Sequence, residues 1–237
     1  MKAALTSAGH YHVEQANCPA TGPVNLKAPR AGVLHTTEGA FESAYNEFQT
    51  KFAPHFLLGR DKTGKVRIVQ FVWLGHYASA LENHAGGVET NTIAVAQIEV
   101  AAFSKQTPWH LDAAVTDALA SLLAELHTEC DIPLTRPFPD KMPPPPWAVE
   151  SFSRRHAGKW GKTAGWYGHV EIPENSHWDP GAYQWSQLLR AAEAKLPDPA
   201  PKPKPKPKKP RYVTFWGARI RVGSKLYKWI KKRGGFD

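Results

Sequence analysis

A loop-forming segment over residues 165–181 carries the side chains most suited to chemistry in this sequence. It contains His169, His177 and Asp179 among Gly, Pro, Asn and Ser residues, which exclude one continuous helix or strand. Imidazole nitrogens and carboxylate oxygens are zinc ligands, and a catalytic zinc commonly takes three protein ligands and one water. A single His near an Asp is more often a hydrogen-bonded surface pair. We therefore interpret His169 and Asp179 as two metal ligands that need a third from elsewhere.

Composition indicates a globular body with a charged appendage. The 237 residues are enough for a sizeable core plus an extra segment, and 42% apolar residues are ordinary for a globular domain. The net charge of +9 is unevenly distributed: residues 201–237 hold 13 Lys and Arg against one acid, and the remainder holds 17 bases and 20 acids. The body has a net charge near −3 and the tail one near +12, which suggests an appended module that binds a polyanion.

The sequence shows no sign of a membrane span or of export. No apolar run approaches the ~18 residues of a membrane span, and the N-terminal segment lacks the apolar region of a signal peptide. We expect a protein made in a cytoplasm and not exported by the Sec route. Cys18 and Cys130 form no C-x-x-C pair and no disulfide framework, so we interpret them as small core residues.

Apolar periodicity predicts an α/β arrangement with strands and helices around one sheet. We expect strands over residues 32–37, 55–60, 65–73 and 92–102. The second and third strands should form a hairpin around the turn at residues 61–64. We expect helices over residues 42–51, 109–130 and 183–196, with a shorter one at 147–156. Residues 1–30 are expected to be irregular, and Thr107 is the predicted N-cap of the second helix.

The C-terminal part differs in composition from the body. Residues 197–210 are a Pro-Lys repeat, which favours an extended polyproline II linker. Residues 211–237 mix aromatic side chains with bases. The predicted organisation is therefore a globular domain over residues 1–196, a linker over 197–210, and a short basic tail over 211–237.

One acid, Glu99, stands inside the otherwise β-branched and apolar strand over residues 92–102. A buried carboxylate is costly unless it has a partner or a chemical role. A structural ion pair is the alternative to a catalytic role. The strand over residues 32–37 likewise contains a histidine near its end, His35, which could complete the ligand set.

Five sequence segments occur in an order that resembles a known family. They are Val33-Leu34-His35-Thr36-Thr37, His55 to Lys65, His84-Ala85-Gly86, Val95 to Glu99, and Gly168-His169 with Pro173 and Asp179-Pro180-Gly181. Over roughly residues 30–192 the chain resembles the zinc-dependent N-acetylmuramoyl-L-alanine amidases of the type-2 amidase and peptidoglycan-recognition family, which includes many phage endolysins. The resemblance implies a single mixed central sheet flanked by helices.

The resemblance also implies roles for individual residues. His35, His169 and Asp179 would be the ligands of Zn²⁺, and Glu99 would transfer the proton between the attacking water and the leaving amine. His177 stands where the family often has a lysine that stabilises the oxyanion.

Two further positions bear on the same site. The resemblance implies substrate binding by Thr36, Asn83 and His84. Some members have a catalytic tyrosine where this chain has Pro54, which favours Glu99 as the proton-transfer group.

The predicted function is hydrolysis of the amide bond between N-acetylmuramic acid and L-alanine in peptidoglycan, by a monomeric phage endolysin that acts on the cell wall after release. The expected partners are peptidoglycan and, through the tail, anionic wall polymers or a membrane surface. The alternative is a peptidoglycan-recognition protein that binds without cutting. Nucleic-acid binding through the tail is disfavoured because the body is acidic and no nucleic-acid motif is present.

Overall fold

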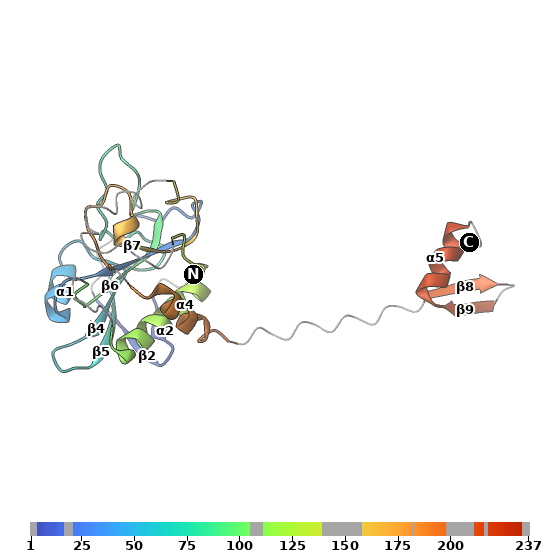
Figure 1. Ribbon diagram of the computed structural model, residues 1–237, viewed down its shortest axis with the longest axis horizontal. Helices are drawn as coiled ribbons and strands as arrows, with labels where there is room; N and C mark the ends of the chain where they lie inside the picture. The colour runs from blue at the N-terminus through green and yellow to red at the C-terminus, as the bar shows by residue number, and fades with distance from the viewer. Residues whose placement is uncertain are drawn as a thin grey trace. The chain divides into compact units, whose positions relative to one another are not determined.

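The computed structural model of the chain describes residues 4–16, 21–104, 111–138, 158–181, 183–197, 211–215 and 218–233. They belong to two compact units, Met1–Leu196 and Pro197–Asp237. The first unit contains a single mixed sheet of seven strands with helices around it (Figure 1). This confirms the α/β arrangement predicted from apolar periodicity.

The sheet has the spatial order β1-β2-β5-β4-β6-β3-β7. Its strands are β1 (Ser7–Ala8), β2 (Tyr11–Gln15), β3 (Ala31–Thr36), β4 (Phe56–Arg60), β5 (Val66–Gln70), β6 (Ala94–Val100) and β7 (Gly165–Gly168). β3 runs parallel to both of its neighbours, β6 and β7, and β4 is parallel to β6. β4 and β5 are antiparallel, which confirms the predicted hairpin.

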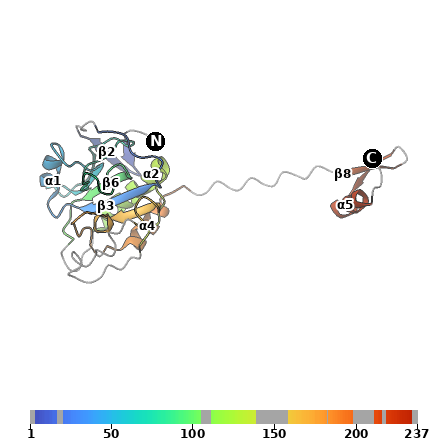
Figure 2. The ribbon, with the colours of Figure 1, turned by 90° about the horizontal axis from the view of Figure 1, so that it is seen from above.

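Helices cover both faces of this sheet. Helices α2 (Ala113–Cys130) and α4 (Trp185–Glu193) pack together over one face, where Leu119, Leu122 and Trp185 join one large apolar cluster. Helix α1 (Phe41–Phe48) lies on the other face and packs through Phe41 and Phe48. Figure 2 shows α1 and α2 on opposite sides of the central strands. The strands between them are therefore buried from both sides.

Strand alternation decides which side chains of β3 and β6 meet. Leu34 and Ile98 belong to the apolar cluster under α2, so the residues next to them in sequence point to the opposite face. His35 and Glu99 are such residues, and they are direct partners in the parallel register of β3 and β6. The sheet therefore places an imidazole beside a carboxylate on the face away from α2.

A close backbone approach holds β7 against β3. A Cβ atom on Gly32 would lie 2.5 Å from the ring of Trp166, which is fully buried. Any larger residue at position 32 would therefore push β7 away from β3. This contact matters for function because β7 leads directly into His169, the first residue of the 3₁₀-helix η2 (His169–Glu171).

Three predictions about local structure were wrong or partly wrong. Residues 1–30 are not irregular, because they contain β1 and β2, and β2 pairs with the distant β5 at the edge of the sheet. Helix α2 begins at Ala113 and not at 109, since the Asp112 carboxylate accepts from the amides of Ala114 and Val115. Helix α4 is shorter than predicted at both ends. The predicted helix at 147–156 and the linker at 198–210 lie outside the described residues.

The second unit contains regular elements that the sequence patterns did not predict. β8 (Arg211–Phe215) and β9 (Ala218–Val222) form an antiparallel hairpin, and α5 (Ser224–Lys232) packs against β8. Leu226 and Trp229 on α5 are about half exposed, and the Arg233 guanidinium lies over the Trp229 ring. Among the helices of the described residues, none combines the length and apolar character that a membrane crossing requires.

His55, which precedes β4, is a fully buried histidine with both ring nitrogens engaged. Its Nδ1 accepts from the backbone N–H of Gln97 at 3.0 Å, and its Nε2 donates to the backbone carbonyl of His76 at 2.8 Å. Burial lowers the pKa of His55 to about 4. The folded protein therefore favours the neutral form of His55.

We expect His55 to make stability fall as the solution becomes acidic. Between the ordinary histidine pKa of about 6.5 and the lowered one, the unfolded chain binds a proton that the folded chain does not. The contribution is present above pH 6.5 and is lost as the pH falls. Urea unfolding should show wild type losing about 2 kcal/mol more between pH 7.5 and 5 than His55→Gln, whose amide keeps a donor and an acceptor. An equal loss in both proteins would contradict this assignment.

Candidate metal centre

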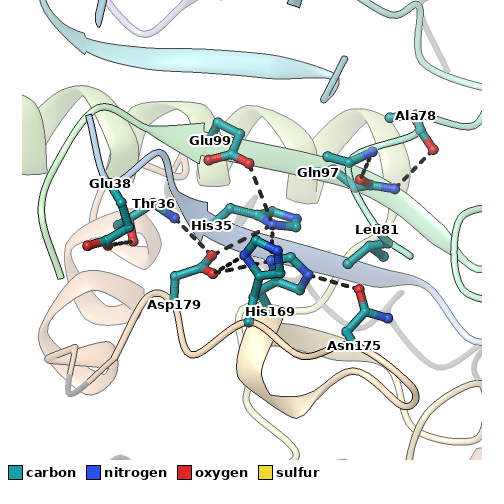
Figure 3. A network of polar contacts seen from close by, with 12 residues as sticks. His35, Thr36, Glu38, Ala78, Leu81, Gln97, Glu99, His169, Asn175 and Asp179 are labelled. Atoms are coloured by element: carbon teal, nitrogen blue, oxygen red, sulfur yellow. Dashed lines mark hydrogen bonds and ion pairs between the residues drawn. The ribbon is translucent and has the colours of Figure 1, made fainter. Parts of the chain in front are cut away.

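His35, His169 and Asp179 converge at one buried point (Figure 3). His35 lies near the end of β3, His169 begins η2 after β7, and Asp179 lies in the following loop. The two Nδ1 atoms are 2.9 Å apart, His169 Nδ1 is 3.3 Å from Asp179 Oδ1, and His35 Nδ1 is 3.8 Å from Asp179 Oδ2. These three side chains could therefore hold a metal ion.

The arrangement fits a tetrahedral ion such as zinc. Zinc bonds of about 2.0–2.1 Å place neighbouring ligand atoms roughly 3.3 Å apart, close to the distances between these atoms. Two imidazole nitrogens and one carboxylate oxygen are a donor set that zinc accepts. Two of the three candidate ligands, His169 and Asp179, also line a groove of about 710 Å³, so the centre is accessible from it.

Asp179 is held in place by its neighbours. The backbone N–H of Thr36 donates to Asp179 Oδ2 at 3.1 Å, which ties the loop to the end of β3. The ring of His177 stacks on His169 with centroids 4.6 Å apart, and His177 Nδ1 is 3.5 Å from Asp179 Oδ1. The His177 side chain is 54% exposed, so it stands at the groove edge of the centre.

Glu99 lies next to the three candidate ligands without being one of them. Its Oε1 is 3.7 Å from His35 Nδ1, while within the described part of the chain its buried Oε2 has no hydrogen-bond partner. Burial, and then the negative charge of Asp179, raise the pKa of the Glu99 carboxyl well above its ordinary value. The carboxyl also lines the groove. It is therefore placed to exchange a proton with a molecule bound there.

A family model matches most of the first unit. The family model described as N-acetylmuramoyl-L-alanine amidase matches residues 25–182, which include the three converging side chains and Glu99. The chain belongs to the N-acetylmuramoyl-L-alanine amidase family. Membership supports amide hydrolysis in peptidoglycan as the activity of this chain. No curated protein sequence matches the chain.

Solved structures of two proteins align with this chain at low sequence identity. A mutant structure of PlyL aligns with a TM-score of 0.47 and 13% identity, covering 77% of this chain and 99% of PlyL. AmpDh3 from Pseudomonas aeruginosa, in complex with anhydromuramic pentapeptide, aligns with a TM-score of 0.45 and 18% identity. That alignment covers 73% of this chain and 63% of AmpDh3.

A buried ion pair fixes the turn that carries His169. Glu171 accepts from the Gly168 amide at 2.8 Å and from the Arg136 guanidinium, and both side chains are almost fully buried. Arg136 also lies 4.0 Å above the Trp185 ring of α4. Sequence reasoning missed this pair. The sequence offered one indication of it, the acid Glu171 two positions after His169. The partner of Glu171, Arg136, lies 35 residues away in sequence.

The groove contains two of the three predicted substrate-binding residues. Thr36 and Asn83 line it, and the Asn83 side-chain oxygen accepts from the Thr90 amide at 3.1 Å. His84 is not among its lining residues; its side chain is 62% exposed and lies 3.6 Å from Glu82. The substrate contacts of all three residues stay predictions.

Metal analysis tests the ligand set directly. We expect one divalent ion per wild-type chain and a nearly metal-free His35→Ala protein, because two remaining ligands hold an ion far more weakly than three. The ratio of metal to protein after dialysis is the measurement. His55→Gln is a matched control, since His55 is equally buried but lies outside the centre. Full metal content in His35→Ala would exclude His35 as a ligand.

Proposed function

We propose that this chain is a zinc-dependent N-acetylmuramoyl-L-alanine amidase that cleaves the bond between the muramic lactyl group and L-alanine of peptidoglycan. The observation that carries the proposal is the buried convergence of His35, His169 and Asp179 beside Glu99, at a groove large enough for a glycopeptide. Family membership supplies the substrate class. The two-nitrogen, one-oxygen donor set is one that zinc accepts.

Zinc bound at this centre would supply a Lewis acid that polarises the amide carbonyl and makes water a better nucleophile. Glu99 takes the proton from the attacking water and passes it to the leaving amine of L-alanine. Its raised pKa suits a group that must hold that proton between the two steps. His177, at the exposed edge of the site, would donate a hydrogen bond to the oxygen that becomes negative.

The products of wall digestion test the reaction. Purified protein incubated with cell walls should release new L-alanine amino termini without new reducing sugars. Reducing sugars would indicate a glycosidase instead. Lysis that persists after the metal is removed with a chelator would contradict the zinc-dependent route.

The role of Glu99 has its own prediction. Glu99→Gln keeps the size of the side chain but cannot accept the proton, so the rate should fall on the order of 10²-fold or more. Metal content should remain at the wild-type ratio, because Glu99 is not a ligand. Turnover of a soluble muramyl peptide and metal analysis measure the two effects. Near wild-type turnover would make Glu99 a structural residue.

Binding without cleavage is the alternative function. A recognition protein needs the groove but neither a complete ligand set nor a carboxyl group beside it. Here His35, His169, Asp179 and Glu99 occur together, which favours the enzyme. Stable retention on walls with no new amino termini would favour recognition.

The biological setting that we propose is host lysis by a phage endolysin whose C-terminal segment anchors it to the envelope. Residues 201–237 carry 13 bases and one acid, so they suit an anionic polymer or membrane face. Leu226 and Trp229, exposed on α5 beside its lysines, add an apolar component that salt does not screen.

Truncation separates anchoring from chemistry. A chain that ends at Leu196 should bind walls more weakly and with less dependence on salt than the full chain. Salt screens exposed charges beyond ~8 Å, so binding through the tail should weaken as salt rises. His35, His169, Asp179 and Glu99 all belong to residues 1–196, which the truncated chain keeps. Cleavage of a small soluble muramyl peptide should therefore be unchanged. Equal wall binding by both forms at low salt would exclude the tail as an anchor.

A further inference from the structure

The ring of His169 contacts a buried side chain that sequence reasoning did not single out, Asn175. His169 Nε2 is 2.9 Å from Asn175 Oδ1, on the other side of the ring from Asp179 (Figure 3). Asn175 is 2% exposed and does not line the groove, so it is placed to act through His169 rather than on a substrate.

The backbone determines which way the Asn175 amide points. The Glu82 N–H can only donate, and it reaches Asn175 Oδ1 at 2.8 Å. The carbonyls of Glu82 and Pro173 can only accept, and they lie 3.2 and 2.8 Å from Asn175 Nδ2. Exchanging the amide oxygen and nitrogen would oppose like groups at all three contacts. Oδ1 therefore faces His169 as an acceptor.

An acceptor at this position decides the tautomer of His169. Nε2 must carry a hydrogen to bond with Asn175 Oδ1, so the neutral ring has its lone pair on Nδ1. Nδ1 is the atom that faces His35 and Asp179. The hydrogen bond thus prepares the nitrogen that a metal would bind.

The other histidine ligand lacks an equivalent support. His35 Nε2 is buried, and no hydrogen-bond partner lies near it among the residues that the structure describes. Of the two imidazoles, His169 is therefore the one whose orientation is set by a side-chain hydrogen bond. We propose that Asn175 is a positioning residue whose acceptor oxygen holds His169 as an Nδ1 ligand and thereby sets the metal affinity of the centre.

The chain offers a matched control in Asn91. Asn175 bonds to the backbone of Glu82, and Asn91 bonds in the same way to the backbone of the residue before it, Leu81. Asn91 Oδ1 accepts from the Leu81 amide at 3.3 Å, and Nδ2 donates to the Leu81 carbonyl at 2.9 Å. It is 8% exposed, and its further partner is Gln97 rather than a metal ligand. Loss of Asn91 should therefore loosen the wall without altering the tautomer of His169.

Zinc affinity, measured in the full chain by competition with a chelator, tests the proposal. Asn175→Leu removes the acceptor and should weaken zinc binding about 10- to 100-fold, the usual effect of losing a group that orients a ligand. Asn175→Asp loses both donors to the backbone carbonyls. Because it keeps an acceptor toward His169, its zinc affinity should equal or exceed that of wild type. Asn91→Leu should bind zinc like wild type, although its free energy of unfolding is lower.

These variants distinguish positioning from general loosening of the loop. Equal weakening in Asn175→Asp and Asn175→Leu, or weakening in Asn91→Leu, would overturn the proposal. The inference rests on metal binding by the proposed amidase but not on catalysis, so an inactive wild type that binds zinc would overturn only the amidase function. A wild type without zinc affinity would overturn both.

A second measurement does not depend on metal or on activity. Nitrogen NMR of labelled, metal-free protein distinguishes a ring nitrogen that carries hydrogen from one that does not. We expect His169 to carry its hydrogen on Nε2 in wild type and in Asn175→Asp, and to lose that preference in Asn175→Leu. A wild-type ring with its hydrogen on Nδ1 alone would overturn the proposal.

Discussion

The pairing register of β3 with β6 is the constraint on which the rest of the site depends. Every residue of β6 is buried, and the strand is hydrogen-bonded on both edges, so its register cannot slip without moving core side chains to the wrong face. That register sets His35 beside Glu99. His35, the proposed ligand, and Glu99, the proposed proton carrier, thus lie on two paired strands. Packing of the core fixes the distance between them.

The other half of the site comes from loops, and polar contacts replace regular structure there. Buried polar groups are costly unless they are paired, so each pairing also selects one loop conformation. The Thr36 amide holds Asp179, and the Arg136–Glu171 pair fixes the turn at His169. Core packing therefore positions the half of the site that lies on strands, and hydrogen bonds position the half that lies on loops.

Sequence patterns predicted the parts of this protein that depend on local order. The apolar runs around His35 and Glu99 predicted two strands. The residue types of His169 and Asp179 on a loop-forming segment predicted a ligand pair, which the structure brings together with His35. Apart from the helix ends, the features that the sequence did not predict depend on distant partners. β2 has little apolar character of its own and exists because β5 offers it an edge. Arg136 and Asn175 look like ordinary loop residues until folding brings Glu171 and His169 to them.

The three converging side chains lie far apart in the sequence, at positions 35, 169 and 179. An ion held by all three would close a loop of more than a hundred residues and would be bound by the folded chain but hardly by the unfolded one. By mass action, free ion at 1,000 times its dissociation constant adds about 4 kcal/mol to the free energy of unfolding. Heat resistance of this protein would then follow the supply of metal in its surroundings, so that scarcity weakens the fold as well as the chemistry.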